Sequence, residues 1–411
     1  MKIFILISWR NLWRHKRRSL VVISSIAIGI FAMMFSMGIM NGFNIQMVEN
    51  TISTSLGHVA IHAKGFQDTM TLEKRFVPTE AIYSAIQSNK AVVSFAPRVK
   101  VQGMIRSSET SRGVLIVGID PEKEKRVSSI YEYTSKKDGS MFLAGSSGDQ
   151  ILISKAMADI LDVGVGDKVV LMIQDKGNEI VGVGLQVTGI FQSPIDSFDK
   201  YVVFLGIEKL QHIVGIGNAI SEITVITKDK GLVDSVKRIL IERIGNENLE
   251  VLSWKDMAPN LVSAIKLYDS MVFVMFLIIF ITVVFSVANT LIMAIMERFH
   301  EIGVMKSIGT SPAKIFFMII FEALNLGAVG LAAGILAGGG LLALLAVKGI
   351  DFSFYMESMR TWGSGSVIYP SISFLNIIQA TAVVIITTLA AALYPAIKAA
   401  RIKPLDALHY I

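Results

Sequence analysis

Long apolar runs without charge alternate along the chain with stretches of mixed polarity. Four runs reach the ~20 residues that a helix needs to cross a hydrocarbon core of about 30 Å. They lie at 20–42, 271–296, 315–347 and 374–397, and only Glu322 interrupts the third. The pattern predicts four transmembrane helices. The first run is too long for a signal-peptide core and no small-residue cleavage site follows it, so we expect a retained anchor.

Residues 43–270, between the first two runs, have shorter patterns. Strand-like alternation occurs at 58–63, 92–107, 113–120, 168–173, 185–191, 200–205 and 222–227. Helical periodicity occurs at 78–89, 154–163 and 232–245. Strands that alternate with helices predict a mixed α/β domain. We therefore expect an α+β membrane protein whose large extracytoplasmic domain is inserted between transmembrane helices one and two.

The order of these elements suggests that one part of the domain interrupts another. Residues 43–145 and 220–256 have the pattern of an α/β subdomain, whereas about 146–219 is rich in strands with short turns. The sequence predicts a β-rich insertion in an α/β subdomain.

Basic residues set the expected orientation. They gather in 1–19, in 297–314 and in 398–411, whereas the 348–373 loop has two basic and two acidic residues. The positive-inside rule then places both termini and the 297–314 loop in the cytoplasm and residues 43–270 outside. Residues 43–270 hold 25 basic and 27 acidic residues, and the remainder holds 14 and 6. The net charge of +6 therefore reflects membrane flanks, not a nucleic-acid surface.

The segment 1–19 has an amphipathic pattern. One face is aromatic and apolar and contains Trp9, Leu12 and Trp13. The other face is basic and contains Arg10, Arg14 and Arg17. Tryptophan prefers the membrane interface, which favours an interfacial elbow helix. A plain basic flank that only sets topology is the alternative.

Composition and motifs argue against catalysis by this chain alone. Apolar residues make up 52% and charged residues 18%, and cysteine is absent, so no disulfide or thiolate metal site exists. The segment 307–314 lacks the first glycine and the Gly-Lys-Ser/Thr ending of a phosphate-binding loop. His58 and His62 fit one face of a strand better than a metal pair. We expect no metal and no cofactor on this chain.

Glu322 lies inside the third apolar run. A carboxylate in a membrane helix is a functional candidate. Because it lies about two turns from the start of the run, a structural role at the cytoplasmic face is the alternative.

The loop 297–314 contains a short amphipathic segment. Its apolar side contains Phe299, Ile302 and Met305, and its polar side contains Glu297, Arg298, Glu301 and Lys306. Gly309 and the following Thr-Ser-Pro predict the end of a helix. Such a cytoplasmic helix between two membrane spans is a candidate lever for a soluble partner. A loop lying in the lipid interface is the alternative.

Three motifs resemble the permease superfamily that contains FtsX and MacB. The run from Glu297–Arg298 through Glu301–Ile302–Gly303 and Lys306 to Ile308–Gly309 is similar to that family's signature. The segments 9–19 and 394–411 resemble its elbow helix and its closing element. Segments 40–65, 113–130, 151–172 and 187–204 further resemble the LolC/LolE lipoprotein-releasing permeases. The match spans most of the chain.

The resemblance implies a permease of the type VII ABC transporters, in the cell inner membrane. Two permeases, either identical or paralogous, would join two copies of a separate ATPase that binds ATP and magnesium. Coupling residues would be Glu297, Arg298, Glu301, Ile302, Gly303, Met305, Lys306 and Gly309. A lipoprotein would enter between the first two helices and pass to a periplasmic carrier. The cavity for it would be lined by Met33, Met37, Met40, Val274, Leu277 and Ile281.

The resemblance leaves other functions open. A MacB-like permease for efflux or peptide export and an FtsX-like regulator of cell-wall hydrolases share these motifs. The motifs also do not distinguish a LolC-like from a LolE-like role, or a homodimer from a heterodimer.

Overall fold

The structure is a computed structural model that describes residues 10, 14, 16–134 and 142–403. It contains two compact units. The bundle comprises the described parts of 1–44, 265–351 and 367–411, and the sheet unit comprises those of 45–264 and 352–366. Most of the predicted elbow helix at 1–19, and residues 404–411 of the predicted tail, lie outside the described residues.

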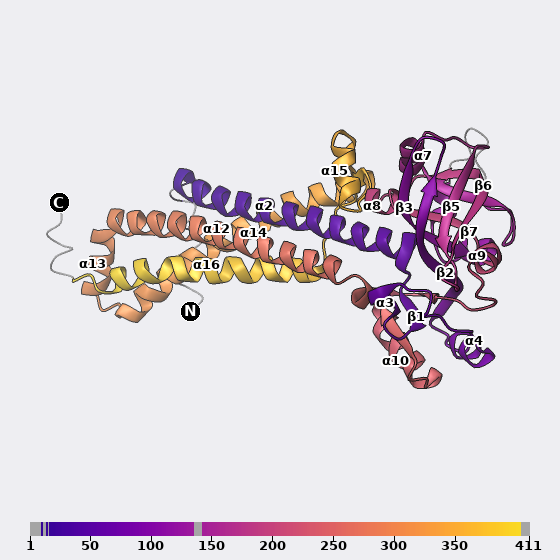
Figure 1. The fold of residues 1–411 in the computed structure, drawn as a ribbon. Helices are drawn as coiled ribbons and strands as arrows, with labels where there is room; N and C mark the ends of the chain where they lie inside the picture. Colours follow the sequence, from indigo (N-terminus) through magenta and orange to yellow (C-terminus); the bar gives the residue numbers. More distant parts are fainter. Residues whose placement is uncertain (1–9, 11–13, 15, 135–141, 404–411) are drawn as a thin grey trace. The chain divides into compact units, whose positions relative to one another are not determined.

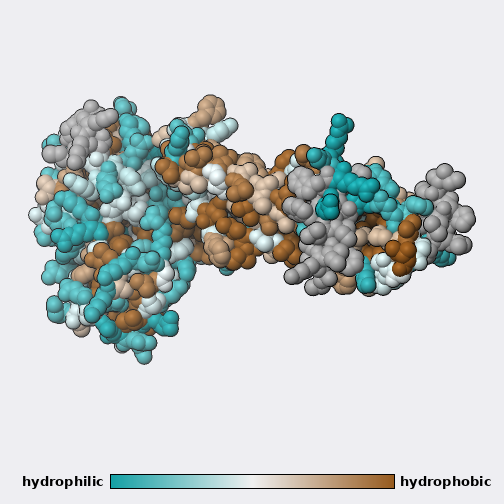
Figure 2. Space-filling model, turned by 180° about the vertical axis from the view of Figure 1, so that it is seen from behind, coloured by the Kyte–Doolittle hydropathy of each residue, from teal (hydrophilic) through white to brown (hydrophobic). Residues whose placement is uncertain are grey.

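Four long helices form the bundle (Figure 1). They are α2 (Lys16–Thr51), α12 (Pro259–Glu297), α14 (Pro312–Lys348) and α16 (Phe374–Ala400). All four are long and apolar enough to cross a membrane, which confirms the predicted membrane fold. Figure 2 shows the apolar surface that these helices expose. The boundary between the two units falls within α2 and within α12.

Local signals set the ends of the helices. Pro312 is the first residue of α14, where its missing N–H costs nothing, and Ser311 before it has an extended backbone. Ser373 and Asn376 form a capping box at the start of α16. The described part of the bundle also contains α13 (Phe299–Ser307) and the paired short strands β10 (Ile350–Asp351) and β11 (Val367–Ile368).

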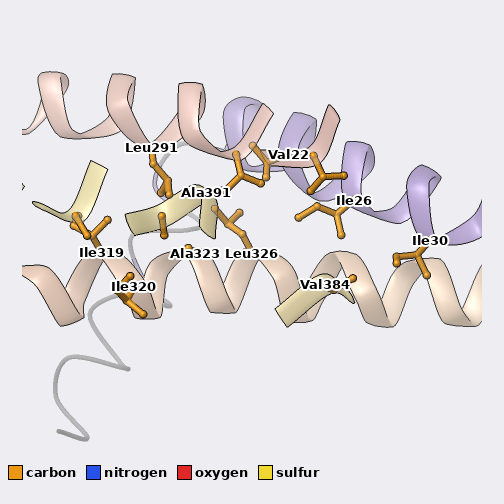
Figure 3. Packing of buried hydrophobic residues seen from close by; sticks show 14 of the residues in the cluster. Val22, Ile26, Ile30, Leu291, Ile319, Ile320, Ala323, Leu326, Val384 and Ala391 are labelled. Atoms are coloured by element: carbon orange, nitrogen blue, oxygen red, sulfur yellow. The ribbon is translucent and has the colours of Figure 1, made fainter. Parts of the chain in front are cut away.

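Branched apolar side chains fill the core of the bundle (Figure 3). Gly330 and Gly334 of α14 are also buried. A Cβ atom on Gly330 or Gly334 of α14 would lie 2.7 Å from the Cβ of Ile26 or Ile30 of α2, respectively. The absence of a side chain at these two positions therefore allows α2 and α14 to pack closely. Close approach through small residues is how helices associate in lipid, where burial of apolar surface supplies no drive.

The described residues of the sheet unit form nine strands. They are β1 (Val59–Ala63), β2 (Val92–Arg106), β3 (Ser111–Ile119), β4 (Gln150–Ser154), β5 (Lys168–Gln174), β6 (Ile180–Phe191), β7 (Val202–Gly206), β8 (Glu222–Thr227) and β9 (Leu249–Ser253). Their order is β3-β7-β4-β6-β5-β2-β8-β1-β9, and β3 also pairs with β2. Six strands therefore close into a ring, and β8, β1 and β9 extend from the first half of β2.

Short helices surround these strands. They are η1 (Ile52–Leu56), α3 (Phe66–Thr69), α4 (Glu80–Gln87), α5 (Pro121–Glu124), α6 (Ile130–Tyr133), α7 (Lys155–Leu161), α8 (Asp196–Asp199), α9 (Ile207–Val214), η3 (Lys230–Leu232), α10 (Val233–Ile244), α11 (Trp254–Met257), η4 (Ser353–Tyr355) and α15 (Met356–Thr361). Helix α10 packs on β1 and β9 and against α4. The mixed α/β character predicted for the inserted domain is confirmed, and its predicted subdomain boundaries stay a prediction.

Residues 352–366 belong to the sheet unit although they lie between α14 and α16 in sequence. Arg360 of α15 donates a hydrogen bond of 2.6 Å to the carboxylate of Asp199 on α8. The backbone N–H of Ser193 donates to the same carboxylate. Burial raises the pKa of Asp199 to about 6, against the lowering effects of the Ser193 hydrogen bonds and of Arg360. The ion pair between Arg360 and Asp199 therefore connects residues 352–366 to the rest of the sheet unit.

Candidate functional site

The predicted coupling segment forms a separate short helix in the bundle. Helix α12 ends at Glu297, Arg298 leaves the helical conformation, and α13 runs from Phe299 to Ser307. Gly309 follows with φ of +94°, a conformation that glycine adopts without strain. The backbone N–H of Thr310 donates to the carbonyl of Met305, which closes the last turn.

Helix α13 turns one apolar side into the bundle. Ile302 is 1% exposed, Gly303 is buried, and Met305 packs against the same core. The coupling role that the family resemblance implies for Ile302 and Met305 stays a prediction. In the structure, Ile302 lies in the core of its own bundle. The apolar residues that α13 and its end expose are Val304, 39% exposed, and Ile308, 79% exposed.

The charged residues of this segment contact other helices of the bundle. Arg14 pairs with Glu301 at 3.2 Å, and Arg18 pairs with Glu297. Lys306 Nζ donates hydrogen bonds of 2.8 and 2.5 Å to the backbone carbonyls of Ala400 and Ile402. A cation at these carbonyls satisfies the acceptors that a helix leaves unpaired at its C-terminal end. These contacts connect the segment around α13 to α2 and to the end of α16.

Glu322 of α14 and Arg298 form a buried ion pair. Arg298 Nη1 lies 3.2 Å from Glu322 Oε1 and 3.3 Å from Oε2. Arg298 is 8% exposed and Glu322 is 5% exposed. Both members of the pair line a cavity of about 260 Å³, and its other lining residues are Leu291, Ala294, Ile295, Glu301, Ile302, Met305, Met318 and Ile319. The pairing places Glu322 beside the coupling segment, which sequence periodicity did not indicate.

The six predicted cavity residues differ in how far they are exposed. Met33 and Met37 of α2 are buried in the bundle core, and Met40 is half-buried. The three residues on α12, Val274, Leu277 and Ile281, are between 46% and 54% exposed. Leu277 lines an apolar cavity of about 250 Å³ together with Phe273, Phe276, Phe280, Val383 and Ile386. The predicted lipoprotein cavity stays a prediction.

The sheet unit contains a buried cluster of charges that the sequence did not reveal. Arg98 lies 2.6 Å from Glu124 and 3.4 Å from Glu222, and Lys100 lies 2.7 Å from Glu222. Arg98, Glu124 and Glu222 are at most 2% exposed. Burial by itself raises the pKa of Glu222, but the opposite effect of Lys100 and Arg98 is larger. The resulting pKa of Glu222 is about 2. The two cations and two carboxylates leave the cluster without net charge.

His62 lies in the same interior. Its ring nitrogens approach Glu222 to 3.8 Å and Glu250 to 4.0 Å, and its side chain is 0% exposed. Burial lowers the pKa of His62 to about 4, against the raising effect of Glu222. His62 is therefore neutral at pH 7, and its place in β1 agrees with the strand position predicted for it.

Two family models match the chain. The MacB-like periplasmic core domain matches residues 19–243, which is more than half of the chain. The C-terminal domain of FtsX-like permeases matches residues 272–404. The second match contains α13, Glu322 and the end of α16, and the first contains the buried charge cluster.

Several known proteins are similar to this chain over nearly its whole length. The lipoprotein-releasing system transmembrane protein LolC of Xylella fastidiosa is 22% identical, over 97% of this chain and 96% of the relative. The LolC protein of Neisseria meningitidis is 23% identical over 95% and 94%. The LolE protein of Haemophilus influenzae is 22% identical over 98% of both chains.

Solved structures and more distant relatives match smaller parts. The periplasmic region of MacB from Actinobacillus actinomycetemcomitans is 13% identical over 53% of this chain and 97% of that structure, with a TM-score of 0.36. The macrolide export protein MacB of Chlorobium luteolum is 33% identical, over 30% of this chain and 16% of the relative.

Proposed function

This chain belongs to the FtsX-like permeases that carry a MacB-like periplasmic core domain, and we propose that it releases lipoproteins from the inner membrane. It is a multi-pass inner-membrane permease of an ABC transporter and works with an ABC ATPase. One observation carries the proposal of lipoprotein release. Relatives named as lipoprotein-releasing proteins match 94% or more of both chains. The macrolide-export relative matches 30% of this chain.

In the proposed assembly, ATP and magnesium bind to a separate ATPase chain, present in two copies. Two permeases, identical or paralogous, would complete the complex. The termini and residues 297–314 would lie in the cytoplasm, and residues 43–270 in the periplasm. The charge distribution along the chain supports this orientation.

The geometry of α13 supports its role as the lever. Lys306 connects α13 to the end of α16, Glu301 connects it to Arg14, and Glu297 just before it pairs with Arg18 of α2. A displacement of α13 by the ATPase would therefore move α2 and α16 as well. The Arg298–Glu322 pair extends the connection to α14. The exposed side chains of Val304 and Ile308 remain for the ATPase to contact.

The proposed cycle follows from these connections. ATP binding would close the two ATPases and shift α13. The four helices would transmit that shift to the sheet unit, and a lipoprotein would pass to a periplasmic carrier.

A release assay tests the proposal. The chain would be reconstituted with its ATPase, its second permease and a triacylated lipoprotein in vesicles, with the soluble carrier outside. We expect ATP to move lipoprotein from the vesicles to the carrier. Glu301→Gln is expected to slow release, and Glu109→Gln, on an exposed turn of the sheet unit, serves as its control.

The same vesicles separate the alternatives. ATP turnover without lipoprotein release, together with export of a macrolide or peptide, would favour the MacB-like function. Activation of a cell-wall hydrolase without any export would favour the FtsX-like function. Robust ATP hydrolysis by this chain alone would contradict its assignment as a permease that depends on a separate ATPase.

A further inference from the structure

The sheet unit contains a cavity of about 510 Å³ on the face of two neighbouring strands. Strands β3 and β7 run parallel, with Leu115 opposite Val202 and Val117 opposite Phe204. Since side chains alternate between the faces of a strand, these four lie on one face and form an apolar floor. Each is at most 9% exposed, and all four line the cavity.

The wall of the cavity has an unusual backbone. After Thr51, the helix continues as the π-helical turn η1, and four residues from 51 to 56 line the cavity: Thr51, Thr54, Ser55 and Leu56. Arg98 Nη1 donates a hydrogen bond of 2.5 Å to the carbonyl of Ser55 in this turn. Single π-helical turns occur frequently at functional sites. Gly57, with φ of +68°, ends the turn.

One polar group in this wall has no partner within the described chain. The hydroxyl of Thr54 lines the cavity, is buried, and forms no hydrogen bond with any described residue. Thr54 is 1% exposed. A buried polar group without a partner is rare in folded proteins and calls for an explanation. A ligand that presents a hydrogen-bond acceptor to Thr54 Oγ1 supplies one.

The charged residues of the cavity restrict the chemistry of such a ligand. Arg98 and Lys100 line it, but Glu124 and Glu222 neutralise them at 2.6 and 2.7 Å. The cluster therefore offers no net positive charge to a free carboxylate or phosphate. A neutral carbonyl that follows a long apolar chain fits the floor and the hydroxyl together. The volume lies in the range of roughly 300–1,000 Å³ that is usual for ligand pockets.

We propose that this cavity binds a fatty acyl chain, with the chain on the floor of β3 and β7 and its ester or amide carbonyl at Thr54 Oγ1. The inference rests on the proposed function, because a lipoprotein in transit carries such chains. The same chemistry is present in a bilayer phospholipid. The exposed ring of Tyr201 and the exposed Ser197 lie at the cavity and mark its open side.

Photolabelling of the full chain, assembled with its partners in vesicles, tests the inference. In one arm, the probe is a synthetic triacylated lipopeptide with a diazirine in one acyl chain. In the other arm, the probe is phosphatidylethanolamine with the same diazirine chain. Mass spectrometry then locates the labelled residues. We expect the lipopeptide to label residues 51–56, 115–117 and 198–204.

Two variants test the site, so that the result does not depend on one substitution that could also unfold the protein. Val117→Trp fills the cavity and is expected to reduce labelling there to background. Thr54→Val keeps the shape and removes an unpaired hydroxyl, so the fold is retained while labelling falls about two- to tenfold, as for one lost hydrogen bond. The controls are Val93→Trp and Thr71→Val, at exposed positions of the same unit.

Each outcome decides one point. Labelling by the lipopeptide supports the inference, and labelling by phosphatidylethanolamine alone would overturn the lipoprotein as the source of the chain. Labels confined to the four long helices in both arms would overturn the acyl site altogether. If the wild-type assembly releases lipoprotein but the cavity stays unlabelled, the inference is wrong and the proposed function stands. If release fails, the phospholipid arm still tests the cavity.

Discussion

Both units of this molecule bury an arginine beside glutamate, but in different surroundings. In the sheet unit, Arg98 lies between Glu124 and Glu222 at 2.6 and 3.4 Å, and all three are nearly inaccessible. In the bundle, Arg298 reaches Glu322 at 3.2 Å beside a cavity. The first is part of a four-charge cluster, and the second joins one arginine to one glutamate. Removal of Arg98 therefore leaves Lys100 to neutralise two buried carboxylates, whereas removal of Arg298 takes away the arginine that pairs with Glu322.

The apolar cores of the two units differ in what stabilises them. The sheet unit excludes water with branched side chains from strands, and burial of their apolar surface is the main stabilising contribution. The bundle gains little from that effect in lipid, so close contact between backbones matters more. Gly330 and Gly334 provide this contact against α2. A substitution that disturbs packing should therefore destabilise the sheet unit through lost burial of apolar surface, and the bundle through lost contact between helix backbones.

The largest expected effect is the removal of the central cation of the sheet unit. Arg98→Gln leaves Glu124 and Glu222 buried with one cation too few. Breaking a buried pair in this way costs about 3–5 kcal/mol of stability. Hydrogen exchange of the β8 amides in the full chain measures the loss. The control is Arg112→Gln, at an exposed position of β3, and equal protection in both variants would contradict the role of the cluster.

Acid should weaken the sheet unit next. The folded pKa of His62 is about 4, below its ordinary value of 6.5, so the unfolded chain binds the proton first. The contribution of His62 to stability is therefore complete above pH 6.5 and is lost as pH falls towards 4. A difference of this size corresponds to roughly 3 kcal/mol. Glu222, with a pKa of about 2 against 4.5, adds a second loss between pH 4.5 and 2.

The variant His62→Phe separates these two windows. It places an apolar ring beside Phe66, which the imidazole already contacts. We expect the loss of stability between pH 6.5 and 4 to disappear, while the loss below pH 4.5 remains. The measurement is the free energy of unfolding of the sheet unit, monitored by hydrogen exchange at a series of pH values from 6.5 to 2. His212→Gln, at an exposed position of α9, should leave both windows in place.

A smaller effect is expected from a single methyl group in the bundle. Gly334→Ala places a Cβ 2.7 Å from the Cβ of Ile30 and 2.9 Å from the carbonyl of Ala27. Such overpacking costs about 1–3 kcal/mol. Gly340→Ala, on the same helix with nothing within 4 Å of the added atom, is the matched control. Thermal unfolding in detergent should separate the two variants, and equal melting temperatures would argue against close packing of α2 and α14.

Sequence periodicity predicted the elements of this fold better than their partners. The alternation at 92–107 and 222–227 corresponds to β2 and β8, and the four apolar runs correspond to the four long helices. The closed ring of six strands was not predicted, because it requires β2 to pair with β3 on one side and with β5 and β8 along the other. Pairing between distant strands depends on chain topology, which local alternation does not record.

The candidate site shows the same limit. The amphipathic pattern within 297–314 predicted a short helix that ends near Gly309, and the structure has α13 there. The sequence pattern could not show that Lys306 donates hydrogen bonds to backbone carbonyls at the end of α16, over 90 residues later. Nor could it rank Ile302 against Ile308, since both are apolar residues of one short segment. Only packing against the other helices separates the buried isoleucine from the exposed one.

The smallest effect on folding is expected at Ile308, and it tests the lever directly. Ile308 is 79% exposed, so Ile308→Asp should change the stability of the bundle by less than about 0.5 kcal/mol. If Ile308 is an apolar anchor for the ATPase, the same change should weaken the complex, because a few buried anchors carry most interface energy. Ile180→Asp, at a 71% exposed position of β6, is the matched control.

Co-purification and cross-linking provide the readout. The chain has no cysteine, so single cysteines at 304, 308 and 180 can each be cross-linked to the ATPase without background from the permease. We expect cross-links at 304 and 308 and none at 180, and loss of the ATPase from purified Ile308→Asp. Ile302→Asp should instead destabilise the bundle, because it buries a charge at a 1% exposed position. Cross-linking at 180 but not at 308 would reverse the orientation and remove α13 as the lever.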